Sequence, residues 1–422
     1  MVDSKEILTL LGINSEKIAS VDYVAKENGV SHLMISLKND QHFCENCGST
    51  NIVVHGYYHT NINNSVIRAS NTYVDVEMRR YKCKDCGKTF KQNFDFYMPY
   101  RKISRAVEIC IKDDLKSAIP FRYLAKKYNL STNTIINIFD SMPRQSRLPL
   151  TSIICVDEFH FSNQGNPKLK YPFVISEPFE GKILDIIESR KTDYLWSYFV
   201  KLTLLERSKV KFFVSDMNET YRNLKKAFFP DATHIIDHFH VAKLFNNAVQ
   251  KVRTKIMKRQ EYESKEYRFL KKNWKMFVVN RSRLKTFKKV TKRNGIVLDW
   301  ELEVDKVLRK YNDLFLVYQA REDFINRMLH EKYWMETKQS IDYFIQRFGH
   351  SEIPELQEIA KTFSNWYTEI INSYAKNTMN MCISNAIAEA NNDNIQTLID
   401  ISYGYGNFER LRNRVLYINR NK

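Results

Sequence analysis

Two copies of a Cys-x-x-Cys-Gly motif constrain the amino-terminal part of this chain more than any other feature of its sequence. They begin at Cys44 and Cys83, with 35 residues between the two cysteine pairs. Thiolates at this spacing can hold one metal ion, and the glycine after each pair can adopt the positive φ that turns backbone N–H groups toward sulfur. The duplicated glycine argues against a redox role. The motifs predict a zinc site made of Cys44, Cys47, Cys83 and Cys86, on a ribbon whose strands cover 51–58 and 72–81.

The remaining cysteines, Cys110, Cys155 and Cys382, stand alone in apolar or helical contexts. Metal binding therefore explains the cysteines better than disulfides do. The chain has no run of about 18 apolar residues, as a membrane span would need, and its first residues lack the pattern of a signal peptide. We therefore expect a cytoplasmic protein with no membrane segment. A length of 422 residues, 43% of them hydrophobic, is enough for two to four domains by the usual range of about 100–200 residues each.

Positive charge is concentrated in one stretch. The formal net charge is +18, and residues 251–295 contain 17 Lys or Arg against three Glu, a local excess of +14. A helix that is merely soluble mixes signs to gain ion pairs, whereas this stretch would repel itself unless phosphate lay nearby. We therefore expect it to bind nucleic acid. Scattered charge on a solvated face is the alternative.

A pair of short helices follows the cysteine ribbon. Residues 119–139 predict a helix, a tight turn at 129–131 and a second helix with Ser131 as its N-cap. This pattern is typical of a helix-turn-helix that enters a DNA groove, although an ordinary helical hairpin has the same spacing. The positions left free for the groove are Thr132, Asn133, Thr134 and Asn137. Residues 142–149 then predict a linker.

Two strand-like runs further along each end on an aspartate, Asp157 and Asp216. Strands are expected at 151–156, 171–176, 182–188, 211–215 and 234–236, with helices at about 194–205 and 219–228. This is the order of an RNase H-like fold, in which the first and fourth strands are neighbours. The two aspartates would then meet and could share divalent cations for phosphoryl transfer. Strand alternation turns Glu158 to the other face.

Residues 251–374 are predominantly helical in pattern and free of strand alternation, so they predict an inserted helical domain. The helix after it places Asn385, Glu389 and Asn392 on one face. A site for two cations needs a third carboxylate, and Glu389 is the best candidate. Spacing alone does not choose among the acids of this region. The other acids are Asp393, Asp400 and Glu409.

These features together resemble the ISL-three family of insertion-sequence transposases over nearly the whole chain. The segments that carry the resemblance, besides the ribbon and the helix pair, are Val-Asp157-Glu, Ser-Asp216-Met, Asp237-His-Phe-His240-Val, Glu389-x-x-Asn392 and the aromatic-glycine tail at 403–408. The family is of the DDE type. The resemblance therefore implies that Asp157, Asp216 and Glu389 hold catalytic magnesium or manganese, with His240 and Asn392 in support. The basic residues often found before the tail are absent at 396–401.

The implied activity is that of a DNA transposase, a metal-dependent polynucleotidyl transferase. It would bind the terminal inverted repeats of its element, cleave the ends and join their 3′-hydroxyls to target DNA by two-metal-ion phosphoryl transfer. The family also implies double-stranded DNA as partner, a homodimer or higher oligomer on DNA, and a place in the bacterial cytoplasm at the nucleoid. Two alternatives stay open. The chain could be an inactive DNA-binding regulator derived from a transposase, or a structure-specific RNase H-like nuclease.

We therefore expect a multidomain α/β protein in which an RNase H-like catalytic domain with a helical insertion follows a zinc ribbon and a helix-turn-helix. The expected parts are the N-terminal zinc-ribbon domain (1–95), the helix-turn-helix (96–145), the first part of the catalytic core (146–250), the basic insertion (251–374) and the last core helices (375–422). The basic residues expected to contact DNA are Arg79, Arg80 and Lys82 beside the second cysteine pair, and Lys271, Lys272, Lys275, Arg281, Arg283, Lys288 and Lys289 in the insertion.

Overall fold

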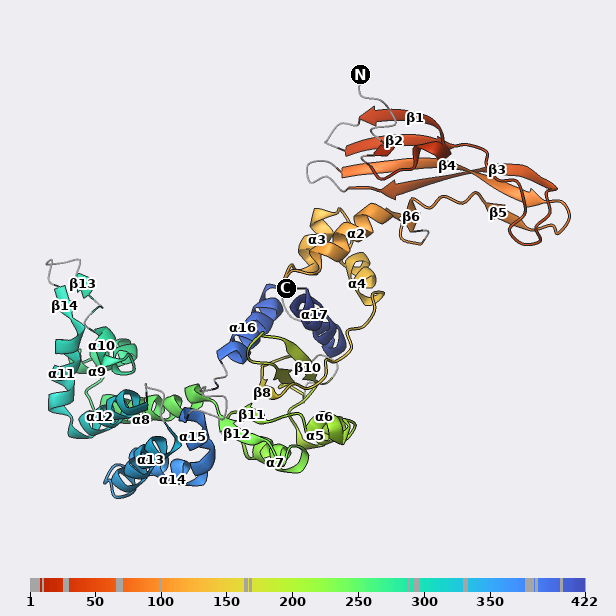
Figure 1. The fold of residues 1–422 in the computed structure, drawn as a ribbon. Coiled ribbons are helices and arrows are strands. Elements are labelled where there is room, and N and C mark those ends of the chain that lie inside the picture. The colour runs from red at the N-terminus through yellow and green to blue at the C-terminus, as the bar shows by residue number, and fades with distance from the viewer. Residues whose placement is uncertain are drawn as a thin grey trace. The chain divides into compact units, whose positions relative to one another are not determined.

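The computed structural model describes residues 8–9, 11–25, 30–65, 71–98, 100–162, 166, 169–284, 286, 288–290, 297–328, 333–375, 383, 386–402 and 405–421. The chain divides into two compact units (Figure 1). The first contains residues 1–146, 162–166 and 395–422, and the second contains residues 147–161 and 167–394. Within the described residues, none of the helices combines the length and the apolar character that a membrane span needs.

The first unit begins with a seven-stranded sheet that follows the short helix η1 (Ser15–Lys17). Its strands are β1 (Ile18–Ala25), β2 (Val30–Leu37), β3 (Ile52–Asn63), β4 (Asn71–Cys83), β5 (Thr89–Lys91), β6 (Tyr97–Met98) and β7 (Ile103–Ser104). They lie in the order β1-β2-β4-β3-β7-β6, with β5 paired to β4. The two predicted ribbon strands are therefore parts of a longer antiparallel pair, β3 and β4. Alternating apolar residues such as Ile35, Ile62 and Val76 are buried between this sheet and its loops.

Helices complete the first unit. They are α2 (Arg105–Asp114), α3 (Phe121–Lys127), α4 (Thr132–Asp140) and, from the end of the chain, α17 (Phe408–Arg420). The predicted helix pair and its cap are confirmed, because the Ser131 hydroxyl accepts a hydrogen bond from the Thr134 N–H at 3.1 Å. Asn129 turns the chain between α3 and α4 with a φ of 52°. Asparagine tolerates this left-handed conformation better than most residues do.

A buried arginine joins α17 to the other helices of the first unit. Arg414 is 0% exposed, and its guanidinium donates hydrogen bonds to the carbonyls of Leu115, Ser117 (2.8 Å) and Ile119 (3.1 Å). These carbonyls lie beyond the end of α2, where no further helical turn provides N–H partners, although the Ser117 carbonyl also accepts from the Ile119 N–H at 2.8 Å. The sequence-based boundaries grouped 375–422 with the catalytic core, whereas the structure groups 395–422 with residues 1–146 because of contacts of this kind.

The second unit contains a five-stranded sheet and the helices α5 (Thr192–Phe199), α6 (Leu204–Arg207) and α7 (Glu219–Phe228). The strands are β8 (Ile153–Glu158), β9 (Phe173–Ser176), β10 (Ile183–Ile187), β11 (Phe212–Ser215) and β12 (Thr233–Ile236), in the order β10-β9-β8-β11-β12. The first three pair antiparallel, and β8, β11 and β12 pair parallel. All five strands occur where the sequence predicted them, and the first and fourth are neighbours.

A helical domain follows β12 in the second unit. Its helices are α8 (His238–Lys258), α9 (Lys265–Lys272), η2 (Trp274–Phe277), α10 (Arg281–Leu284), α11 (Trp300–Lys310), α12 (Asn312–Met328), α13 (Trp334–Gly349), α14 (Pro354–Asn365) and α15 (Tyr367–Tyr374). Phe245, Phe324 and Phe344 pack together in its core. The segment 251–374 is predominantly helical, and it also contains a short hairpin of β13 (Lys288–Val290) and β14 (Val297–Asp299) that the sequence pattern did not indicate. Helix α16 (Ala386–Ile401) follows the domain.

Replacing Arg414 with Met should destabilise the first unit by about 2–4 kcal/mol, because the carbonyls of Leu115, Ser117 and Ile119 would lose the hydrogen bonds of a buried guanidinium. Hydrogen exchange of the full chain, read by mass spectrometry, should show faster exchange in α2, α3 and α4. The same change at the exposed Arg144 is the control and should leave exchange unaltered. Equal protection in the two variants would contradict the structural role given to Arg414.

Candidate metal centres

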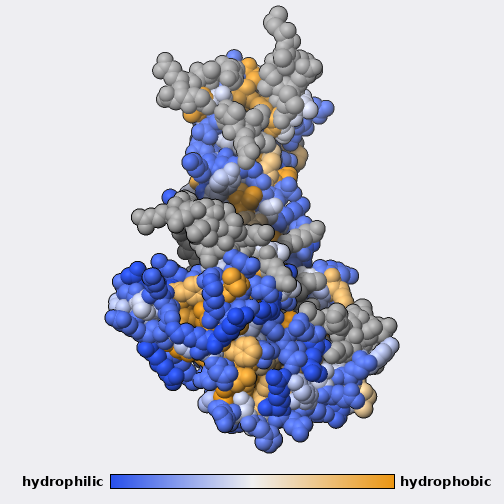
Figure 2. All heavy atoms as spheres, turned by 90° about the vertical axis from the view of Figure 1, so that its left-hand side faces the viewer, coloured by the Kyte–Doolittle hydropathy of each residue, from blue (hydrophilic) through white to orange (hydrophobic). Residues whose placement is uncertain are grey.

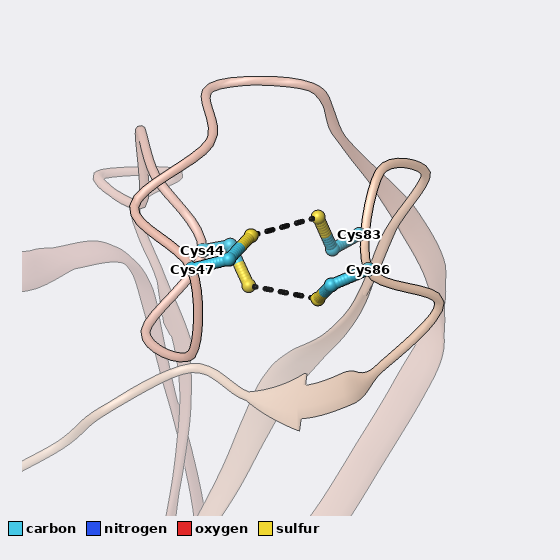
Figure 3. Close-up of side chains that lie close together, drawn as sticks. All are labelled: Cys44, Cys47, Cys83 and Cys86. Carbon is cyan, nitrogen blue, oxygen red and sulfur yellow. Dashed lines mark hydrogen bonds between the residues drawn. The ribbon is translucent and has the colours of Figure 1, made fainter.

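The four cysteines of the two motifs converge at one point of the first unit (Figure 3). All four sulfurs lie within 4.8 Å of one another, with Cys44–Cys86 and Cys47–Cys83 separations of 3.7 Å. A tetrahedral zinc ion with Zn–S bonds of about 2.3 Å requires sulfurs about 3.8 Å apart, so the arrangement fits zinc.

Backbone conformation shapes both cysteine loops. Gly48 and Gly87 each have a φ of 73°, the left-handed region that glycine favours. Backbone N–H groups, that of Cys86 foremost, lower the pKa of the Cys83 thiol to about 7. A lowered pKa favours the thiolate that binds metal. Asn51 donates to Asp85 at 2.9 Å, which ties the end of one loop to the other.

A second group of ligand-type side chains surrounds the carboxyl ends of β8 and β11. Asp157 is near the end of β8, and Asp216 directly follows β11. Asn392 of α16 donates its amide to Asp157 Oδ2 at 2.8 Å, and the Glu158 N–H binds Asp157 Oδ1 at the same distance. Glu389, in the first turn of α16, interacts with Asp237. Helix α16 thus brings its carboxylate and its amide to the same edge of the sheet.

The carboxylates at this edge are held at a cost in free energy. Burial raises the pKa of Asp157 to about 7 and that of Asp216 to about 6, and burial also raises the pKa of Glu389. His240 has a raised pKa, mainly through its hydrogen bond with Asp237 and further through Asp216 and Asp157. Burial is therefore the main source of this cost, and the neighbouring carboxylates add to it.

Two oxygens in this group are suited to a cation. Asp216 Oδ1 and Asn392 Oδ1 are buried, and each is without a hydrogen-bond partner among the described residues. Buried oxygens of carboxylates and amides are ligands that magnesium and manganese prefer. The oxygens of Asp157, Asp216 and Glu389 do not all lie within 4.8 Å of one another, since the cysteines form the one such group of three or more ligands in the described ranges. The three carboxylates are therefore farther apart than the four sulfurs of the cysteine site.

Glu158 has two partners of its own. Arg190 and the hydroxyl of Tyr221 bind its two carboxylate oxygens. Arg190 also lies over the ring of Tyr171, at 4.5 Å. These contacts agree with the expectation that Glu158 turns away from its neighbour Asp157, and they add a positive charge beside the site that sequence reasoning did not single out.

Asp237 precedes the first turn of α8 but does not cap that helix with its side chain. It is 3% exposed, it directly follows β12, and its side chain makes no capping hydrogen bond to α8. Instead its Oδ2 lies 2.9 Å from His240 Nδ1. A signal was present in the sequence, because Asp237 ends a strand in the same manner as Asp157 and Asp216.

The residues expected to read DNA in the first unit are mostly exposed. Thr132, Asn133 and Asn137 of α4 face solvent, while Thr134 is half-buried and shares a hydrogen bond with Ser131. On β4, Arg80 and Lys82 are exposed. Arg79 differs, because it is half-buried and donates to the Leu37 carbonyl at 2.5 Å.

The basic stretch of the helical domain is partly neutralised by acids from other helices. Lys251 pairs with Glu358 at 2.6 Å, and Lys255 pairs with Glu355 at 2.5 Å. Arg281 pairs with Asp305 at 2.8 Å. These pairs weaken the argument that the stretch must repel itself. The cations that stay exposed include Lys271, Lys272, Lys275 and Arg283.

Figure 2 shows hydrophilic residues over much of the described surface in that view. Lys288 and Lys289 lie on β13, but their side chains are outside the described residues. Asn385, Cys382 and residues 403–404 of the aromatic-glycine tail also lie outside the described residues.

Two family models match the chain. One, described as Transposase and named for the DDE enzymes of the ISL-three group, matches residues 154–415. The other, described as the zinc-finger of transposase IS204/IS1001/IS1096/IS1165, matches residues 40–86. The first covers more than half of the chain, and the second contains all four cysteines. No curated protein matches the chain.

Replacing Cys83 with Ser should remove bound zinc, because three ligands no longer close the tetrahedron. Metal analysis should find about one zinc per chain in the unaltered protein and much less in the variant. Changing Cys110 to Ser, which lies on α2 away from the four ligands, should leave the zinc content unchanged. Full zinc content in the Cys83 variant would contradict the four-cysteine assignment.

Replacing Asp216 with Asn should stabilise the second unit at pH 8 in a chelator by up to about 3 kcal/mol. The pKa of Asp216 is raised from the ordinary 3.8 to about 6, so the folded protein binds a proton that the unfolded chain has lost. The free energy of unfolding therefore falls as the pH rises from about 4 to about 6, and an amide, which does not ionise, removes this loss. The gain should vanish below about pH 4.

Tryptophan fluorescence can follow this change, because all five tryptophans lie in the second unit. Urea unfolding curves at pH 8 and at pH 4 give the comparison. Asp313→Asn, at an exposed position of α12, is the control and should show no such pH-dependent gain. An Asp216 variant that is no more stable at pH 8 would show that the carboxylate carries no burial cost.

Proposed function

The chain belongs to the transposase family whose model matches residues 154–415, and from that premise we propose that it is an insertion-sequence transposase of the DDE type. It would cut the ends of its element and join the 3′-hydroxyls to target DNA. The observation that carries the proposal is the pairing of β8 with β11, which ends in Asp157 and Asp216 beside the helix that bears Glu389. The strand order β10-β9-β8-β11-β12 supports an RNase H-like catalytic core.

We assign the three carboxylates to the binding of catalytic magnesium or manganese. Such ions, when bound, activate the attacking hydroxyl and stabilise the leaving oxygen. Asp157, Asp216 and Glu389 would hold the ions, and Asn392 would orient Asp157 through its hydrogen bond to Oδ2. Asp237 would fix the orientation of the His240 ring through its hydrogen bond with Nδ1. The unpartnered Oδ1 of Asp216 supports this assignment.

DNA binding is assigned to three exposed surfaces. Arg80 and Lys82 on the ribbon and the start of α4 would engage the element ends, and the free lysines of α9 and η2 would bind phosphate. Arg79 and Arg281 have partners within the protein and are weaker candidates. Synapsis of two ends requires at least two protomers, so we expect a dimer or higher oligomer on DNA.

Changing Glu389 to Gln should lower strand joining by at least about 100-fold, because the amide cannot replace a metal-binding carboxylate. The assay combines pre-cut ends of the element, supercoiled target DNA and magnesium, and measures joined products on a gel. The other acids of this region provide matched controls. Asp393→Asn, Asp400→Asn and Glu409→Gln should keep joining within a few-fold of the unaltered protein. Wild-type joining by the Glu389 variant, with loss in one control, would move the third carboxylate to that position.

The same assay distinguishes the alternatives. Cleavage of uncut ends with no joined product would identify a structure-specific nuclease. Binding of the ends without cleavage or joining would identify a DNA-binding regulator. Joined products that depend on Asp157 and Asp216 support the transposase.

A further inference from the structure

The helical domain contains a cleft of about 630 Å³ that the proposed chemistry does not use. Its lining comes from α10, α11, α12 and α13, and it includes Arg281, which the sequence had suggested as a DNA contact. The cleft lies entirely within the second unit.

One residue that lines this cleft has a buried hydroxyl without a hydrogen-bond partner in the described part of the chain. Tyr318 lines the cleft and is 1% exposed, and its hydroxyl lacks a hydrogen-bond partner among the described residues. A buried polar group left unsatisfied costs about 1–3 kcal/mol. Such a cost is retained most readily where a ligand supplies the missing partner.

The acids of the cleft are already occupied, which argues against a cation as the ligand. Asp305 pairs with Arg281 at 2.8 Å, and Asp323 pairs with Arg347 at 2.8 Å. Glu322 pairs with Arg321. Because each carboxylate has an arginine, the lining offers no free negative charge to a metal ion or an amine.

Among the described residues, the lining side chains that do not form ion pairs include a guanidinium, two amides and an aromatic ring. Arg309 is exposed and forms no ion pair within the described residues, and the amides of Gln319 and Asn326 are also exposed. Phe315 is 37% exposed and presents an aromatic ring. An aromatic ring, amides that can donate and accept, and a free guanidinium together suit a planar heterocycle that carries phosphate.

We propose that this cleft binds a nucleotide, with its base against Phe315 and the Tyr318 hydroxyl and its phosphate on Arg309. The nucleotide could come from bound DNA or from free mononucleotide, and the former rests on the proposed function. The exposed lysines of the same domain are consistent with a polyanion close to the cleft.

Tyr318→Phe tests the proposal, because it removes only the unpartnered hydroxyl. Calorimetric titration with the four deoxynucleoside monophosphates, and fluorescence anisotropy with a single-stranded oligonucleotide and a duplex, measure binding by the full chain. We expect affinity for at least one of these probes to fall about 5- to 30-fold, the loss of one hydrogen bond. The melting temperature of the free protein should stay the same or rise. Tyr311→Phe, whose hydroxyl binds Glu266 at 3.3 Å, is the matched control and should bind as the unaltered chain does.

Arg309→Ala, at an exposed position that cannot unfold the domain, provides a second variant and should weaken the same probe. Mononucleotide binding that is lost in both variants supports the cleft whether or not the chain joins DNA strands. An effect confined to single-stranded or duplex DNA supports DNA as the source. Unchanged affinity for every probe in the Tyr318 variant, or a fall in its melting temperature without ligand, would overturn the proposal.

Discussion

Parallel hydrogen bonding between β8 and β11 is the constraint on which the candidate catalytic site depends. Phe213 pairs with Ile154 and Val214 with Cys155, so both strands end at the same edge of the sheet and present Asp157 and Asp216 there. Strand β12 pairs with β11 in the same direction and adds Asp237. Side chains from three strand ends and from α16 therefore lie at one edge of the sheet, where burial raises the pKa values of the carboxyl groups. Under the proposed function, a cation bound between these carboxylates would relieve this cost in stability.

Arginine links distant parts of the chain in both units. Arg414 binds three carbonyls in the segment between α2 and α3, and these hydrogen bonds hold the last helix against the helices of the first unit. In the helical domain, Arg281 binds Asp305 of α11, and Arg321 of α12 donates to Asn246 of α8 and to the Val278 carbonyl. A guanidinium has several donors in a fixed plane, so one side chain can satisfy acceptors from several segments.

The local excess of positive charge was the sequence feature that agreed least with the structure. The excess between 251 and 295 suggested self-repulsion, yet Glu355 and Glu358 of α14 neutralise two of its lysines. These acids are about a hundred positions away in the chain, so no local window could include them. The net charge still favours a polyanionic partner, but the residues free to contact it are fewer than the count of basic residues suggests.

The sequence by itself determined the features that depend on local spacing: the two cysteine motifs, the five strands, the aspartates Asp157 and Asp216 at the ends of two of them, and the α3–α4 pair with its Ser131 cap. Each follows from periodicity or from the conformation of a few adjacent residues. Only the tertiary structure decided that Asn392 binds Asp157, that Asp237 directs His240, and that the Tyr318 hydroxyl lacks a partner. Those facts depend on contacts between segments far apart in the chain. Local sequence patterns do not show which of many possible partners come together in the folded protein.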